Sequence, residues 1–300
     1  MIRHTLALAL LPLALGAQPN FDTITVRVTP VRNGVYVLTG AGGNIGLSVG
    51  DDAAFVIDDQ FAPLSAKILA AIATVTPKPV RFVVNTHWHG DHTGGNENLG
   101  RAGAVLVAHD NVRRRMSTGQ LVEFFNRTDP PAAPGALPVV TFNDSTTFHL
   151  NGDDIVAFHV PPAHTDGDVV IHFRKANVIH MGDTFMTNRF PFADLSSGGN
   201  AAGIVAAADR ALAVCDAETR VIPGHGTVTD CTGLRSYRDM IATIRDRVRA
   251  AMRDGKSLDA VKAAKLAADF QARLSGPSNV NADQFVEFMY RSLTAGDGRR

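Results

Sequence analysis

Four side chains that can hold a metal ion lie within six residues of the sequence, in the run H-W-H-G-D-H at residues 87–92. His87 and His89 are two positions apart, so both point to the same side if the segment is extended. Gly90 lets the chain turn, and Asp91 and His92 then project from the start of the next helix. Imidazole and carboxylate groups are the ligands that zinc takes in hydrolytic sites. A motif this dense predicts a metal site.

Three further ligand-type side chains each follow a predicted strand. His164 lies in the run P-A-H-T-D-G, Asp183 in M-G-D-T and His225 in P-G-H-G. Each is next to a residue that permits a tight turn. Loops that extend from a rigid sheet are the usual place for a functional site. We therefore expect these side chains to join the motif at residues 87–92.

Together these motifs resemble those of the metallo-β-lactamase-fold hydrolase superfamily, over about residues 24–228. The resemblance implies an α/β fold, the four-layer αββα sandwich, with the metals at one edge of the two sheets. It also implies a role for each residue: a first metal on His87, His89 and His164, a second on Asp91, His92 and His225, and a bridge between them from Asp183. Asp58 would accept a hydrogen bond from a ligand imidazole. No motif covers the chain beyond about residue 232.

The chemistry that this resemblance implies is zinc-dependent hydrolysis, with two Zn²⁺ per chain. A hydroxide that bridges the metals attacks a carbonyl carbon, and one metal accepts the developing oxyanion. Asp91 is the catalytic residue, placed to orient the hydroxide and to accept its proton. The expected substrate is a small molecule with a lactone, thioester, ester or lactam bond.

Two other activities of the same fold are alternatives. True β-lactamases usually have cysteine or serine where this chain has Asp183, so the aspartate favours the thioesterase and lactonase branches over lactam hydrolysis. Persulfide dioxygenases use one iron on the equivalents of His87, His164 and Asp183, all of which are present here. His225 favours the hydrolase, and a non-catalytic metal-binding domain is a third interpretation.

The elements that must position these residues are mostly short apolar strands. We expect strands at residues 23–28, 35–39, 45–49, 53–57, 80–84, 104–108, 139–142, 146–150, 155–160, 169–173, 178–180 and 220–222. Helices are expected at 63–75, from about 110, and at 201–214. Strands followed by a helix, in two successive halves, predict two packed sheets with helices outside.

Two segments have no such pattern. Residues 117–138 are rich in proline and fit either a lid over a site or a surface loop. The segment 184–200 contains Phe185, Phe190 and Phe192, and we expect at least one of them to line an apolar pocket. For Trp88, core packing is favoured over substrate contact. The run 42–44 (G-G-N) is interpreted as a hairpin turn near the site.

The C-terminal part is predicted to be helical. Apolar residues recur at three- and four-residue spacing from Leu234 to Val248, and Ser257 and Asn281 are expected to cap two further helices. We expect a single domain over residues 22–297 that includes these helices.

The N-terminus and the composition suggest where the protein acts. A basic start, a short apolar run and small residues predict a signal peptide over residues 1–17, hence the periplasm or secretion. Outside the cytosol Cys215 and Cys231 could form a disulfide or remain free thiols. Acidic and basic residues number 29 each, which excludes a strongly charged surface for nucleic acid. No later segment is predicted to span a membrane, and the oligomeric state is left open.

Overall fold

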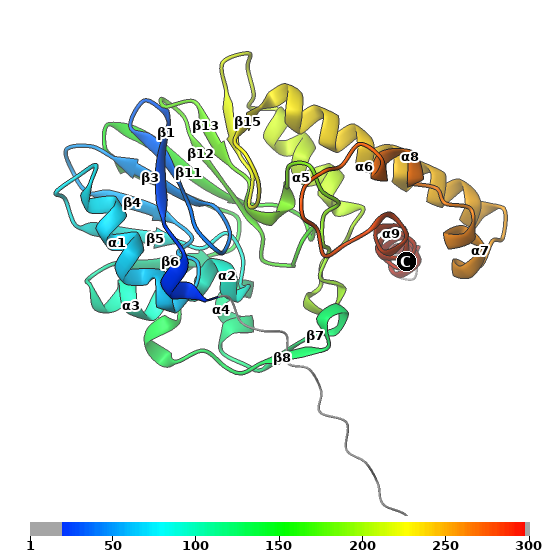
Figure 1. Cartoon of the computed structure of the whole chain (residues 1–300), viewed down its shortest axis with the longest axis horizontal. Coiled ribbons are helices and arrows are strands. Elements are labelled where there is room, and N and C mark those ends of the chain that lie inside the picture. The colour runs from blue at the N-terminus through cyan, green and yellow to red at the C-terminus, as the bar shows by residue number, and fades with distance from the viewer. Residues whose placement is uncertain (1–19, 298–300) are drawn as a thin grey trace, which may run out of the picture.

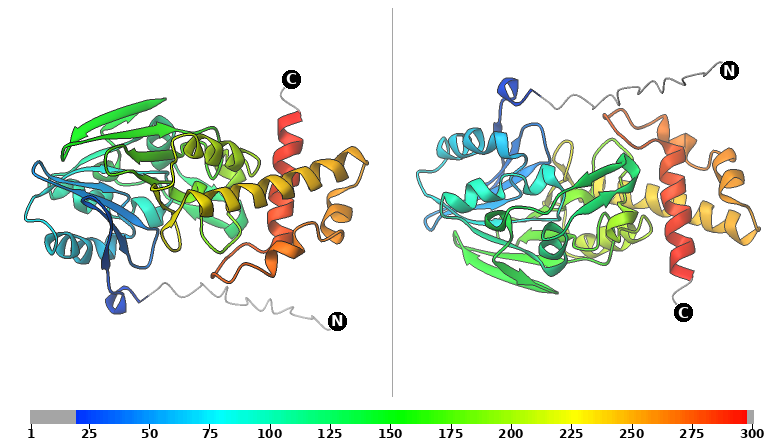
Figure 2. Two further views of the ribbon diagram at one scale, coloured as in Figure 1. Left: turned by 90° about the horizontal axis from the view of Figure 1, so that it is seen from above. Right: turned by 90° about the horizontal axis from the view of Figure 1, so that it is seen from below.

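Two β-sheets pack face to face in this computed structural model, which describes residues 20–297, and helices cover both outer faces (Figures 1 and 2). This is the predicted αββα sandwich. The expected signal peptide at residues 1–17 lies outside the described residues. Within residues 20–297, no helix combines the length and the apolar character needed to cross a bilayer.

The first sheet has the strand order β1-β2-β3-β4-β5-β6-β9. Its strands are β1 (Arg27–Arg32), β2 (Val35–Thr39), β3 (Ile45–Val49), β4 (Ala54–Ile57), β5 (Val80–Val84), β6 (Val105–His109) and β9 (Val140–Phe142). Strands β1 to β4 are antiparallel, and β4, β5, β6 and β9 are parallel. The carboxyl ends of β4 and β5 therefore meet at one edge of the sheet.

The second sheet has the order β10-β11-β12-β13-β14-β15. Its strands are β10 (Ser145–Leu150), β11 (Asp153–His159), β12 (Val169–Phe173), β13 (Val178–His180), β14 (Arg220–Ile222) and β15 (Thr229–Asp230). Only β13 and β14 pair in parallel, so their carboxyl ends also share an edge. A separate two-stranded sheet pairs β7 (Gln120–Val122) with β8 (Arg127–Asp129).

The core is layered because the central strands are apolar on both faces. In β4, Phe55 and Ile57 point between the two sheets, whereas Ala54 and Val56 point to the helices outside the first sheet. This is the two-residue alternation of a strand that is buried on both sides. Between the sheets, the ring of Phe55 packs on that of Phe148, 4.9 Å away.

Helices complete the two outer layers. The first sheet is covered by α1 (Ser65–Ala73), α2 (Gly90–Thr93), α3 (Asn96–Arg101) and α4 (Asp110–Met116). On the second sheet lie α5 (Gly203–Leu212) and α6 (Cys231–Arg253), followed by α7 (Leu258–Ala263), α8 (Ala268–Gln271) and α9 (Ala282–Asp297). Helix α9 crosses α6 and shares its apolar core (Figure 2).

Local sequence signals explain how the C-terminal helices begin. The Ser257 hydroxyl accepts a hydrogen bond from the amide of Ala260, and the Asn281 side chain accepts one from the amide of Gln284. Both caps are as predicted. A disulfide between Cys215 and Cys231, which the sequence left open, joins the segment after α5 to the start of α6.

The structure differs from the expected elements in the first strand and in the segment 117–138, and it adds the short strand β15. The first strand begins at Arg27, not at residue 23, because residues 21–23 form a helical turn. Lys67 donates hydrogen bonds to the carbonyl groups of Phe21 and Ile24, which withdraws them from strand pairing. The segment 117–138 contains the β7–β8 hairpin, in which Asn126 takes the left-handed conformation that its turn requires.

Candidate metal centre

The seven expected ligands meet at the edge where the parallel strands of both sheets end. His87 and His89 follow β5, and Asp91 and His92 lie in the short helix α2. The other three come from the second sheet, in the loops after β11, β13 and β14: His164, Asp183 and His225. Ligand sites outside the carboxyl ends of parallel strands are the general rule for such sheets.

One group of ligand atoms consists of three imidazoles. Nitrogen atoms of His87, His89 and His164 lie within 4.8 Å of one another, and all three side chains are buried. His164 Nε2 is 2.9 Å from His89 Nδ1. Three nitrogen donors at this spacing could hold one metal ion.

Hydrogen bonds behind the rings decide which nitrogens face inward. His164 Nδ1 donates to the carbonyl oxygen of Phe192 at 2.7 Å, and His89 Nε2 is 3.0 Å from the carboxylate of Asp194. Both protons are then on the outer nitrogens, so two lone pairs face each other across 2.9 Å. His87 Nε2 is also buried and has no hydrogen-bond partner among the described residues. A cation between these nitrogens satisfies all three, so the residues fit a bound metal.

The second group contains two imidazoles and a carboxylate. His225 Nε2 lies 3.2 Å from Asp91 Oδ2 and 3.4 Å from His92 Nε2. The carboxylate of Asp183 reaches both groups: one oxygen is 3.2 Å from His92 Nε2, and the other is 3.6 Å from His164 Nε2. Asp183 therefore lies between the two groups.

Asp58 holds His92 from behind. Its Oδ2 is 2.8 Å from His92 Nδ1, and both of its oxygens accept hydrogen bonds from Thr86, from the amide and from the hydroxyl, at 2.7 Å each. This leaves His92 Nε2 free to face the site. A carboxylate behind an imidazole fixes its orientation and raises its basicity.

Burial and charge set the protonation of the centre. Burial lowers the pKa of His164 to about 4 and also lowers that of His87, so both are neutral at pH 7 and offer lone pairs. Burial also acts to lower the pKa of His225. The negative charges of Asp183 and Asp91 raise this pKa by more than burial lowers it, so the net value is about 9. Without a metal His225 is therefore protonated, and a metal cation would take the place of that proton.

Two glycines make the close packing possible. A Cβ atom on Gly43 would overlap the His92 ring, and one on Gly224 would overlap the carboxylate of Asp183. Asn44 then ties the first loop to the last, since its side-chain amide donates to the carbonyl oxygens of Pro223 and Gly226 at 2.8 and 2.9 Å. The run at residues 42–44 is thus a hairpin turn that also supports the His225 loop.

Comparison with known proteins identifies the family. Residues 38–225, more than half of the chain, match the family model described as the metallo-beta-lactamase superfamily. The chain belongs to the metallo-beta-lactamase superfamily. Besides this membership, the chain has a cluster of histidines and aspartates that could hold a metal ion.

Relatives within the superfamily are distant in sequence. Hydroxyacylglutathione hydrolases from Nitrosococcus oceani and Anaeromyxobacter dehalogenans are 26% and 29% identical, over 59% and 60% of this chain and 60% and 59% of their own. The alpha subunit of 2,4-dinitroanisole O-demethylase from a Nocardioides species is 26% identical over 57% of this chain and 50% of its own. The chain thus spans about half to three fifths of these curated relatives.

Solved structures of the superfamily share the fold. A stereoselective inverting sec-alkylsulfatase from a Pseudomonas species superposes with a TM-score of 0.65 at 17% identity, over 89% of this chain and 50% of its own. A metallo-beta-lactamase from Pontibacter korlensis gives 0.60 at 21% identity, over 73% of this chain and 99% of its own.

The three candidate pocket phenylalanines have different surroundings in this superfamily member. Phe192 packs beside the centre, with its ring 6.0 Å from that of His89 and 5.6 Å from that of His164. Phe185 packs on Tyr237 and Phe190 on Phe285, so both belong to the core below α6 and α9. Trp88 is buried in the same core, as favoured from the sequence.

Sequence reasoning missed two side chains near the centre. Asp194 is buried and bonds to His89, but it lies 105 residues away in a segment without periodic pattern. Arg189 is half-buried, and its Nε has no hydrogen-bond partner among the described residues. Burial lowers the pKa of Arg189 and the charge of Asp183 raises it, so the guanidinium lies in the field of the centre.

Proposed function

We propose that this protein is a zinc-dependent hydrolase of esters or thioesters. The observation that carries the proposal is the position of Asp183, whose two oxygens reach both groups of candidate ligands. A donor set that consists of imidazole and carboxylate groups suits zinc. The relatives named hydroxyacylglutathione hydrolase add support, because an acyl group on glutathione is held through a thioester.

The proposed assignment places two Zn²⁺ in each chain. His87, His89 and His164 would hold the first, Asp91, His92 and His225 the second, and Asp183 would contact both. When bound, such a pair would act as a Lewis acid toward a carbonyl oxygen and would lower the pKa of a bound water molecule to about 7.

The residues of the chain supply the rest of the chemistry. Asp91 is the most exposed carboxylate of the centre, and it lies 3.2 Å from His225 Nε2. It is therefore placed to orient a water molecule and to accept its proton. Asp58 and Asp194 keep two imidazoles in one tautomer, and the ring of Phe192 excludes water from the side of His89.

The experiment is metal analysis of the purified protein together with a substrate panel. The panel contains a lactone, a thioester, a cephalosporin and a phosphodiester. Two zinc ions per chain and fastest turnover of the thioester or the lactone are expected. Fastest turnover of the cephalosporin would instead favour the β-lactamase alternative, and a single iron with oxygen-dependent consumption of a persulfide would favour the dioxygenase.

Variants separate the centre from the rest of the protein. Asp183→Ala should lose bound metal and turnover while its circular dichroism stays native, because a ligand to both metals is removed. His149→Ala, at an exposed histidine outside the centre, serves as the control. Full metal content in Asp183→Ala would contradict the assignment.

We also propose that the protein acts in the periplasm or is secreted. The predicted signal peptide at residues 1–17 is the main support. The Cys215–Cys231 disulfide is consistent with an oxidising compartment. Cell fractionation and mass spectrometry of the mature N-terminus test this: an unprocessed protein in the cytosol would contradict it.

A further inference from the structure

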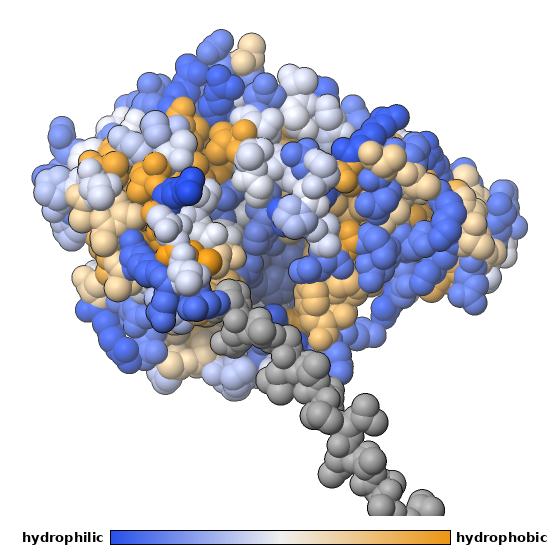
Figure 3. Space-filling view, viewed as in Figure 1, coloured by the Kyte–Doolittle hydropathy of each residue, from blue (hydrophilic) through white to orange (hydrophobic). Residues whose placement is uncertain are grey.

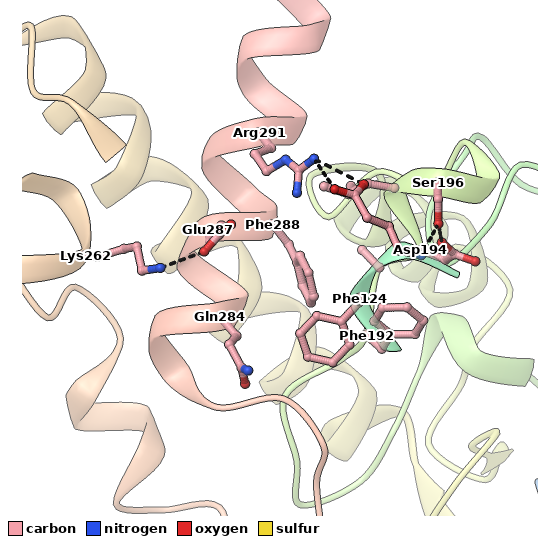
Figure 4. Close-up of a pocket in the computed structure, with 12 residues that line it drawn as sticks. Phe124, Phe192, Asp194, Ser196, Lys262, Gln284, Glu287, Phe288 and Arg291 are labelled. Carbon is pink, nitrogen blue, oxygen red and sulfur yellow. Dashed lines mark hydrogen bonds and ion pairs between the residues drawn. The ribbon is translucent and has the colours of Figure 1, made fainter. Parts of the chain in front are cut away.

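A cavity of about 330 Å³ lies beside the metal centre, between α9 and the segment at residues 192–196 (Figure 4). This volume is at the lower end of the range for small-molecule sites. Helix α7 and the segment after β7 complete its walls. In the space-filling view, an apolar area borders a recess of this face near the position that β7 has in Figure 1 (Figure 3).

One wall of the cavity is aromatic. Phe124, Phe192 and Phe288 come from three separate parts of the chain, and their ring centres are 5.1 to 5.7 Å apart. The three rings lie together in Figure 4. Phenyl rings offer large apolar contact area to a ligand and prefer tilted or edge-on partners.

The cavity and the metal centre share a wall. The ring of Phe192 is stacked 6.0 Å from that of His89, and its carbonyl oxygen accepts the hydrogen bond from His164. Asp194, which also lines the cavity, bonds to His89. A group held in this cavity is therefore one side-chain layer from the candidate ligands of the first metal.

The charges around the cavity are paired and leave no spare cation among the lining residues. Lys262 forms an ion pair with Glu287 at 2.7 Å, and Arg291 forms one with Glu123 at 3.4 Å (Figure 4). Asp194 adds a third carboxylate, so the lining has one more acidic than basic side chain. An anionic ligand group would meet a net negative wall.

We propose that this cavity selects substrates by an uncharged aromatic or bulky aliphatic group. The preferred substrates would then be neutral esters or thioesters with such a group, and glutathione conjugates, which carry two carboxylates and one ammonium group, would be poor. This inference rests on the proposed hydrolase function. The side-chain oxygen of Gln284 accepts from the amide of Asn281, and within residues 20–297 its nitrogen makes no hydrogen bond, so that nitrogen could donate to a neutral acceptor.

The first test compares substrates with the metal-loaded enzyme. A phenylacetyl thioester of a neutral thiol should have kcat/KM at least about tenfold above those of the acetyl thioester and of a phenylacetyl thioester with a para-carboxylate. Phe288→Leu should reduce the preference for phenylacetyl over acetyl by about tenfold. Phe270→Leu, at a ring on α8 that is held by Arg247 and Arg273, is the matched control and should retain the preference.

The second test changes the charge at the rim without touching the aromatic wall. Glu287→Gln leaves Lys262 without its ion-pair partner. The ratio of kcat/KM for the para-carboxylate substrate to kcat/KM for the neutral phenylacetyl thioester should therefore rise several-fold. Glu218→Gln, at an exposed glutamate outside the lining, is its control. The proposal would be overturned if Glu287→Gln left the kcat/KM ratio of the para-carboxylate to the neutral substrate unchanged and Phe288→Leu left the preference for phenylacetyl over acetyl unchanged.

A binding measurement separates this inference from the proposed function. Phenylacetamide is neutral and serves as a probe in ligand-observed NMR. Binding to the wild type that is weakened in Phe288→Leu supports the cavity even if none of the esters is hydrolysed, in which case the proposed function fails. If the esters are hydrolysed at a rate that does not depend on Phe288, and phenylacetamide does not bind, the proposed role of the cavity is wrong. The proposed hydrolase function would then remain.

Discussion

At the scale of the residue, the centre depends on carboxylates that never contact the reacting atoms. Asp58 lies behind His92, and Asp194 lies behind His89. Each fixes a proton on the outer nitrogen of its imidazole and so turns the lone pair toward the site. These residues are positioning residues, and their loss should affect metal affinity before it affects the fold.

Asp194→Asn tests this role. The amide keeps the size of the side chain but removes the negative charge that faces His89 Nε2, so zinc affinity should fall by about 10–100-fold. Competition with a chromogenic chelator measures it. Asp246→Asn, at an exposed surface aspartate, is the control and should keep wild-type affinity. Equal affinities in both variants would show that Asp194 does not support the ligand.

Asp91→Asn separates binding from proton transfer. A neutral amide can still contact a metal but cannot accept a proton, and general-base assistance is worth about 10²–10⁴-fold in rate. We expect turnover at saturating zinc to fall by that factor with little change in KM. Full recovery of turnover at high zinc would mean that Asp91 acts as a ligand only.

At the scale of the element, two strands of different sheets end in stacked histidines outside the centre. The rings of His109, at the end of β6, and His159, at the end of β11, are 3.8 Å apart and nearly parallel. Burial lowers the pKa of both, and the charge of His159 lowers that of His109 further. The folded protein therefore binds fewer protons here than the unfolded chain does.

This pair predicts a loss of stability on acidification. A folded pKa below the unfolded value of about 6.5 means that stability falls as the pH drops through and below that value. His109→Asn keeps a capping side chain on α4 and removes one of the two titratable groups, so its melting temperature should fall less than that of the wild type between about pH 7.5 and about pH 5.5. His149→Asn, at an exposed histidine, should behave like the wild type.

The disulfide is the second feature at this scale. Cys215 and Cys231 are 16 positions apart, and the loop that they close contains β14 and the candidate ligand His225. Closing a loop of this size contributes about 3 kcal/mol to the free energy of unfolding. The variant with serine at both positions should lose about that amount in urea denaturation and become insensitive to reductant. No change on reduction of the wild type would contradict this.

At the scale of the whole molecule, the centre joins the two halves of the sandwich. Candidate ligands from the first sheet meet those from the second, and a bound metal would therefore stabilise the folded chain only. Zinc at a hundredfold excess over its Kd should add about 2.7 kcal/mol to the free energy of unfolding. Chelation should lower the melting temperature, and Asp183→Ala should show a smaller shift than the wild type. A chelator that leaves the wild type unchanged would argue against a metal in the purified protein.

Much of this protein could be predicted from its sequence because the signals are local. The unbroken apolar run of β4 marks a strand buried on both faces, and the six residues at 87–92 contain four ligand-type side chains. Ser257 and Asn281 mark helix starts through hydrogen bonds that reach only three residues. Such patterns depend on the period of a strand or helix, which the order of residues carries directly.

The tertiary structure alone decided which distant residues meet. Asp194 reaches His89 across 105 positions, and nothing near either residue indicates the pair. Phe192 lines the cavity while Phe185 and Phe190, a few residues away, pack in the core. These outcomes depend on how α6 and α9 pack over the second sheet, and that packing is a sum of many weak contacts. The period of an element tells which of its faces is buried, but the partner on that face is chosen by the packing of the whole chain.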